Sequence, residues 1–103
     1  MIPWLGKEES DEVKRVIESG WIAQGPEVQR FEQEFATKVG SVEAIAVSNC
    51  TTGLQLALIV AGVKAGDEVI VPSFSYIATA NSVVQAGGVP IFADVCGKTG
   101  NLT

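Results

Sequence analysis

The stretch best suited to chemistry is a polar turn at residues 48–52, which reads Ser-Asn-Cys-Thr-Thr. An apolar, partly β-branched run at residues 42–47 precedes it and is predicted to be a buried strand. Good helix formers follow, so a helix is expected at residues 52–63. A turn that opens a helix directs unpaired backbone N–H groups at one point, with the positive end of the helix dipole behind them. That arrangement suits an anion, above all a phosphate. Capping of the helix by Thr51 or Thr52 is the commoner role of such residues and explains the same pattern.

A second polar turn, at residues 72–76, follows the next predicted strand. In open α/β sheets a ligand binds beyond the carboxyl ends of the strands, and both turns fall there. The second turn carries Phe74 and Tyr76, whose rings could lie against a planar ligand. Taken alone, a tyrosine such as Tyr76 is more often an ordinary half-buried residue than a stacking platform. One turn suited to an anion and one suited to a ring together favour a phosphorylated aromatic cofactor.

The composition indicates a piece of a larger protein. The chain has 103 residues, about one small domain, of which 47% are hydrophobic. Its mean hydropathy of +0.29 is high for a chain too short to hide much surface. No apolar run approaches the roughly 20 residues that span a bilayer, so no membrane segment is predicted.

Charge and residue usage exclude several classes of function. The net charge is −5 and no basic stripe occurs, so no nucleic-acid partner is expected. The sequence has no histidine, which makes a zinc site improbable and excludes a catalytic triad that needs one. The start of the chain lacks the pattern of a signal peptide, so a cytoplasmic location is expected.

The order of predicted elements defines the fold class. Two helices are expected first, at residues 7–19 and 26–38, with a loop containing Trp21 between them. From residue 42 onward strands and helices alternate, with strands at 42–47, 68–71 and 89–95 and helices at 52–63 and 74–86. Alternation at this spacing predicts parallel strands joined by right-handed crossovers, which is an α/β fold.

Four stretches, residues 20–26, 46–58, 66–81 and 88–95, resemble in order and spacing the N-terminal part of the DegT/StrS aminotransferases. These enzymes depend on pyridoxal 5'-phosphate (PLP), and most of them aminate keto-sugar nucleotides for cell-surface polysaccharides or antibiotic sugars. The resemblance implies the N-terminal portion of the fold type I large domain, a three-layer structure around a mostly parallel sheet, incomplete in this chain. Residues 1–41 would form a helical segment with a loop on the substrate and dimer side. Residues 42–103 would form the first strand-helix-strand-helix-strand part of the PLP-binding domain.

The resemblance also assigns cofactor-binding roles. Cys50, Thr51 and Thr52 match the turn that binds the PLP phosphate through backbone N–H groups and a hydroxyl. Tyr76 matches the aromatic residue that stacks on the pyridine ring. Cys50 is expected to be a small filler and not a nucleophile, because no base accompanies it.

On the substrate side, Trp21 and Gln24 are candidates for contact with the sugar nucleotide. The family's imine-forming lysine and the aspartate that binds the pyridine nitrogen lie downstream of the matched region. No catalytic residue and no metal ligand is therefore predicted in this chain, and the segment alone is expected to be inactive. A keto-sugar nucleotide, an amino-acid donor (glutamate in this family) and a homodimer are the implied partners.

The resemblance has a consequence for stability. In the family's sheet the strand matching residues 42–47 lies at one edge, and its neighbour comes later in the sequence. The segment would then expose apolar faces and strand edges, so it is not expected to fold stably alone. The alternatives are a dehydratase or a non-catalytic regulator on the same fold, and a small stand-alone module that binds phosphate. A lysine or a histidine at the downstream imine position would separate an aminotransferase from a dehydratase.

Overall fold

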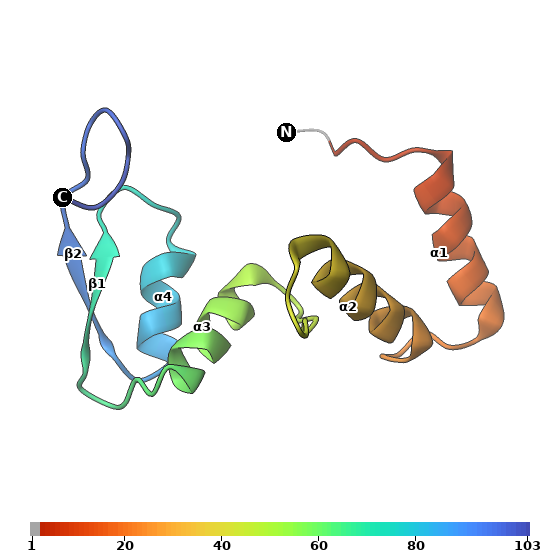
Figure 1. Ribbon diagram of the computed structural model, residues 1–103, viewed down its shortest axis with the longest axis horizontal. Coiled ribbons are helices and arrows are strands. Elements are labelled where there is room, and N and C mark those ends of the chain that lie inside the picture. The colour runs from red at the N-terminus through yellow and green to blue at the C-terminus, as the bar shows by residue number, and fades with distance from the viewer. Residues whose placement is uncertain (1–2) are drawn as a thin grey trace. The chain divides into compact units, whose positions relative to one another are not determined.

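The computed structural model describes residues 3–103, and the chain divides into two compact units, Met1–Ala46 and Val47–Thr103. The first unit contains two helices, α1 (Lys7–Ser19) and α2 (Pro26–Val39). The second contains α3 (Cys50–Val60), β1 (Glu68–Pro72), α4 (Ala78–Gln85) and β2 (Val89–Ala93) (Figure 1). No helix within residues 3–103 has the length and apolarity needed to cross a membrane.

Both helices of the first unit are bounded by residues that favour the start or the end of a helix. The backbone N–H of Gly6 donates to the Glu9 carboxylate at 2.7 Å at the start of α1, and Pro26 is the first residue of α2. Gly20 and Gly40 end the helices in the left-handed conformation, with φ of 74° and 70°. The prediction for residues 7–19 is confirmed, and α2 continues one residue past the predicted end.

Ion pairs join the two helices. The Arg15 guanidinium lies 2.7 Å from the Glu12 carboxylate of its own helix and 3.0 Å from the Glu27 carboxylate of α2. Arg30 also contacts Glu27 at 3.0 Å. These side chains are largely exposed, so each pair contributes little to the free energy of unfolding.

The second unit is built on a strand-helix-strand crossover. β1 and β2 pair in parallel from Glu68 opposite Val89 to Pro72 opposite Ala93. α4 packs against both strands and α3 packs against α4. The core consists of small side chains, with Val83 1% exposed and the Ser82 hydroxyl satisfied by donating to the Thr79 carbonyl at 2.9 Å. The predicted parallel α/β arrangement is confirmed for this part of the fold.

The predicted bounds of three elements, α3, α4 and β2, are wrong for local reasons. α3 runs over residues 50–60 and not 52–63, because its cap lies earlier and a turn with Gly62 at φ 92° follows it. α4 begins at Ala78 and not at residue 74, since residues 73–77 form a turn after β1. β2 ends at Ala93, two residues before the predicted end, where its pairing with Pro72 ends.

Residues 42–47 do not form the predicted strand. Within residues 3–103 no strand pairs with them, and a strand needs the hydrogen bonds of a neighbour. Val42 is 97% exposed and Ile45 is also largely exposed. The apolar run therefore has strand composition without a strand partner, as the incomplete sheet implied.

The surface is larger than a finished fold of this mass would have. The chain exposes 8439 Å². A compact protein of its mass would expose about 5,500 Å², and two compact units of half that mass about 6,700 Å². Ile70 and its partner Ile91 lie on the opposite side of the sheet from buried Val71 and remain exposed. The chain thus forms part of a layered α/β fold, with one face of its sheet uncovered.

Candidate functional site

The first turn of α3 is organised by Asn49. The Asn49 side-chain oxygen accepts hydrogen bonds from the Thr52 backbone N–H at 2.9 Å and from the Thr52 hydroxyl at 3.2 Å. Asparagine is among the residues preferred as a helix cap for this reason. The prediction that Thr51 or Thr52 caps the helix is wrong, and Asn49, which sequence reasoning passed over, performs that role. The signal for it was an asparagine three residues before Thr52.

The cap leaves other donors of this turn available. The backbone N–H groups of Cys50 and Thr51 lie in the first turn, where no intrahelical carbonyl is available to them. The hydroxyls of Ser48 and Thr52 lie 3.2 Å apart beside them. The first turn of α3, which the structure describes in full, carries no acidic side chain. N–H groups, hydroxyls and the positive end of the helix dipole thus converge on a site suited to an anion.

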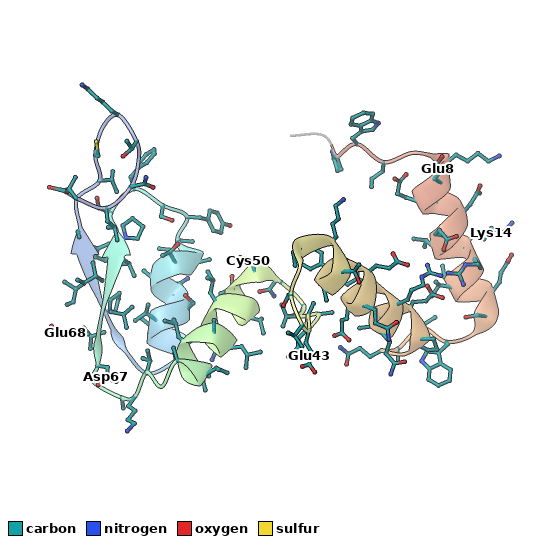
Figure 2. The ribbon with its side chains drawn as sticks, viewed as in Figure 1. Glu8, Lys14, Glu43, Cys50, Asp67 and Glu68 are labelled. Atoms are coloured by element: carbon teal, nitrogen blue, oxygen red, sulfur yellow. The ribbon has the colours of Figure 1, made fainter. Side chains whose placement is uncertain are left out.

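Cys50 stands at the start of α3 and is exposed (Figure 2). Its thiol fills no packed space among the residues that the structure describes, which differs from the expected filler role. The three predicted phosphate-site residues Cys50, Thr51 and Thr52 lie together in one helical turn.

Tyr76 lies in the turn between β1 and α4. Its side chain is 80% exposed, and its backbone carbonyl accepts the Thr79 N–H at 3.0 Å. The Ser75 and Thr79 hydroxyls are 2.8 Å apart and brace the same turn. In Figure 1, α3 and α4 both begin toward the end of the unit at which β1 finishes. The hydrogen bonds of this turn hold the Tyr76 backbone in place, while its exposed ring is free to stack on a planar ligand.

Trp21 and Gln24 are brought together in the loop between α1 and α2. The Trp21 indole N–H donates to the backbone carbonyl of Gln24 at 3.1 Å. The ring folds over Gly25, where a Cβ atom would collide with the indole nitrogen. The ring, 59% exposed, borders a hollow of about 530 Å³ that is also lined by Arg15 and Glu27. Since its single polar group is already bonded, Trp21 can offer a ligand only the face of its ring.

Known proteins are similar to this chain in both sequence and fold. The model of the DegT/DnrJ/EryC1/StrS aminotransferase family matches residues 3–103. The spore coat polysaccharide biosynthesis protein SpsC of Bacillus subtilis is 46% identical over 101 residues, which are 98% of this chain and 26% of SpsC. The chain thus spans about a quarter of the length of that relative.

Two solved structures are similar to this chain in their three-dimensional fold. An aminotransferase from Psychrobacter cryohalolentis is 43% identical, with a TM-score of 0.90 over 98% of this chain and 26% of that one. The GDP-4-keto-6-deoxy-D-mannose-3-dehydratase of Escherichia coli, solved with bound hydrated PLP, is 28% identical, with a TM-score of 0.88 over 99% of this chain and 28% of that one. The match of the family model to nearly the whole chain decides the classification. This chain belongs to the DegT/DnrJ/EryC1/StrS aminotransferase family.

Proposed function

We propose that this chain is the N-terminal segment of a PLP-dependent aminotransferase that moves an amino group from glutamate to a keto-sugar nucleotide. The observation that carries the proposal is the capped first turn of α3, with the N–H groups of Cys50 and Thr51 left available for an anion. Membership of the family and the PLP bound to the E. coli relative support a phosphorylated cofactor. The name of that relative, a keto-sugar nucleotide dehydratase, supports the substrate class.

Each named residue would perform a limited task. The N–H groups of Cys50 and Thr51 would hold the cofactor phosphate, and the Thr52 hydroxyl would join them by turning its hydrogen away from the Asn49 oxygen. The exposed Tyr76 ring would cover the pyridine. Bound PLP supplies an electron sink for the amino acid. The loop carrying Trp21 would border the sugar nucleotide through its ring face.

The chemical step needs residues beyond this segment. The five lysines of the chain, at positions 7, 14, 38, 64 and 98, lie on helix faces or in turns. None of them matches the family's imine-forming lysine, so we expect the segment alone to bind one side of the cofactor at most and to transfer nothing. The complete enzyme would act as a homodimer, with the active site at the dimer interface.

A dehydratase is the second candidate, because the E. coli relative of similar fold is named for loss of water from a keto-sugar nucleotide. A histidine at the downstream imine position would favour it, and a lysine would favour the aminotransferase. A regulator without catalysis would have neither. A stand-alone phosphate-binding module would have an intact mass of 10.8 kDa in its source, whereas our proposal requires one several times larger.

The direct test uses the full-length protein with PLP, glutamate and a keto-sugar nucleotide. We expect an amino sugar and 2-oxoglutarate in equal amounts, and weaker PLP binding in T52V, which loses a hydroxyl at nearly constant volume. T37V is the matched control, because the Thr37 hydroxyl only bonds the Gln33 carbonyl on α2. A dehydrated sugar without amino transfer would establish the second candidate, and a protein that binds no PLP would overturn both.

A further inference from the structure

Thr79, the second residue of α4, forms hydrogen bonds through its N–H, its hydroxyl and its carbonyl. The backbone N–H donates to the Tyr76 carbonyl at 3.0 Å, and the hydroxyl lies 2.8 Å from the Ser75 hydroxyl. The Thr79 carbonyl accepts the hydroxyl of Ser82 at 2.9 Å, and Ser82 is buried in the core. This one residue therefore connects the turn that carries Tyr76 to the core of the second unit.

The turn that carries Tyr76, residues 73–77, is held by hydrogen bonds and not by packing of its large side chains. Phe74, Tyr76 and Ile77 are all largely exposed. The side chain of Ile77, which directly precedes α4, does not cap that helix. At the start of the turn, the Ser73 N–H donates to the Ala93 carbonyl of β2 at 2.9 Å. The bonds to β2 at one end and to α4 at the other therefore locate this turn.

The two bonds from Thr79 lie on either side of the Tyr76 Cα atom, since Ser75 precedes it and the Tyr76 carbonyl follows it. We propose that Thr79 is a positioning residue for the Tyr76 ring. Its hydroxyl and N–H restrict the backbone that carries the ring, so the ring loses less conformational entropy when a planar cofactor stacks on it. The inference rests on the proposed stacking role of Tyr76.

The hydroxyl is the part of this contact that depends on the type of residue. Any residue except proline at position 79 could donate its N–H to the Tyr76 carbonyl, whereas the bond to Ser75 needs a polar side chain. Ser75 is exposed, so water can replace its partner and no buried polar group is left without a hydrogen bond. The hydroxyl pair can therefore be broken while the backbone bonds of Thr79 remain.

The experiment compares variants of the full-length apo-protein. T79V removes the hydroxyl at nearly constant volume, S75A removes its partner, and T79S keeps a hydroxyl. T37V is the matched control, because the Thr37 hydroxyl bonds only the Gln33 carbonyl on α2. T79V is also combined with S75A, and separately with Y76A, which lacks the ring. The readouts are the dissociation constants of PLP and of inorganic phosphate, which has no ring.

We expect Y76A to bind PLP about tenfold more weakly, because it loses a stacked aromatic ring. T79V and S75A should each weaken PLP binding about threefold, as loss of one neutral hydrogen bond predicts. The double variant S75A/T79V should be no weaker than either single variant, since both remove the same bond. T79S should retain most of the affinity, and T37V should behave like the wild type.

Two results distinguish positioning of the ring from a purely structural role of Thr79. Phosphate binding should not change in T79V, and T79V should have no further effect on PLP binding in Y76A. A structural role would weaken phosphate binding as well, and would weaken PLP binding equally with and without the ring. Either of these results would overturn the inference.

The outcomes also separate this inference from the proposed function. If Y76A weakens PLP binding and neither T79V nor S75A does, the positioning role is wrong and the stacking role of Tyr76 stands. If Y76A binds PLP as tightly as the wild type, the stacking role itself is wrong. Should T79V fail to fold, S75A removes the same bond at an exposed position, and an unchanged affinity of S75A for PLP would overturn the inference.

Discussion

Replacement of Asn49 separates the folding role of the α3 turn from its proposed binding role. Asn49 accepts from the Thr52 N–H at 2.9 Å, and either carboxylate oxygen of an aspartate could replace that acceptor. Loss of the cap in N49A should lower the free energy of unfolding by about 1 kcal/mol. N49D should retain the cap and add a negative charge at the positive end of the helix dipole, which is favourable by about 0.3–1 kcal/mol.

The affinity for a phosphate should rank the two variants in the order opposite to their stability. A phosphate held by the N–H groups of Cys50 and Thr51 would lie roughly 6–8 Å from the new carboxylate, between two and three hydrogen-bond lengths along the turn. Two unit charges at that separation repel by about 2–3 kcal/mol at an effective dielectric constant of about 20. Allowing for screening by salt, we expect N49D to bind PLP at least about tenfold more weakly. N49A, which loses the cap but gains no charge, should weaken PLP binding less than N49D does.

The assay is reconstitution of the full-length apo-protein with PLP, beside its unfolding by urea. Pyridoxal serves as the control ligand, because a ligand without phosphate should not sense the charge at residue 49. High salt should reduce the defect of N49D. If N49D binds PLP as tightly as the wild type while it keeps its stability, no phosphate lies at this turn and the reasoning fails.

Three further predictions follow from the contacts described above. G25A should displace the Trp21 ring and break its bond to Gln24, and an unchanged NMR signal of the indole N–H would contradict this contact. The Arg15 guanidinium, through its hydrogen bond, holds the pKa of the Glu12 carboxyl below its usual range, so the stabilising effect of this pair is present above the ordinary glutamate pKa and is lost as the pH falls through the lowered one. In R15A the pKa of Glu12, measured by NMR titration, should return toward its ordinary value, and an unaltered titration would refute the assignment. The segment expressed alone should associate and bind a dye specific for apolar surface, because its exposed area is well above that of a compact protein. A monomer that melts in one sharp transition without binding the dye would contradict that prediction.

The sequence predicted which stretch of the chain forms the candidate site, but it did not predict the contacts within that site. A polar turn between an apolar run and a helix is visible in the sequence, and its residues 50–52 do open α3. The sequence did not single out the residue that caps the helix, because asparagine, serine and threonine at adjacent positions are all good caps. The bond between the Ser75 and Thr79 hydroxyls was not predictable either, because serine and threonine hydroxyls also bond nearby backbone groups.

The sequence by itself determined the local elements and the class of the fold. Helix stops at Gly20 and Gly40, the proline that opens α2 and the alternation of β1, α4 and β2 depend on backbone preferences and short-range periodicity. Its motifs also indicated the family that the comparisons then established.

Tertiary structure alone decided which of the predicted strands could form. β1 and β2 are strands because each is the other's hydrogen-bonded partner, whereas residues 42–47, of equal strand character, remain irregular without one. Likewise, the Trp21 indole N–H is unavailable to a polar ligand, because the ring lies over Gly25 and the N–H donates to the Gln24 carbonyl. The composition of a segment indicates which element it can form. For a strand, a neighbouring strand must also be present in space, because only then are its backbone hydrogen bonds made.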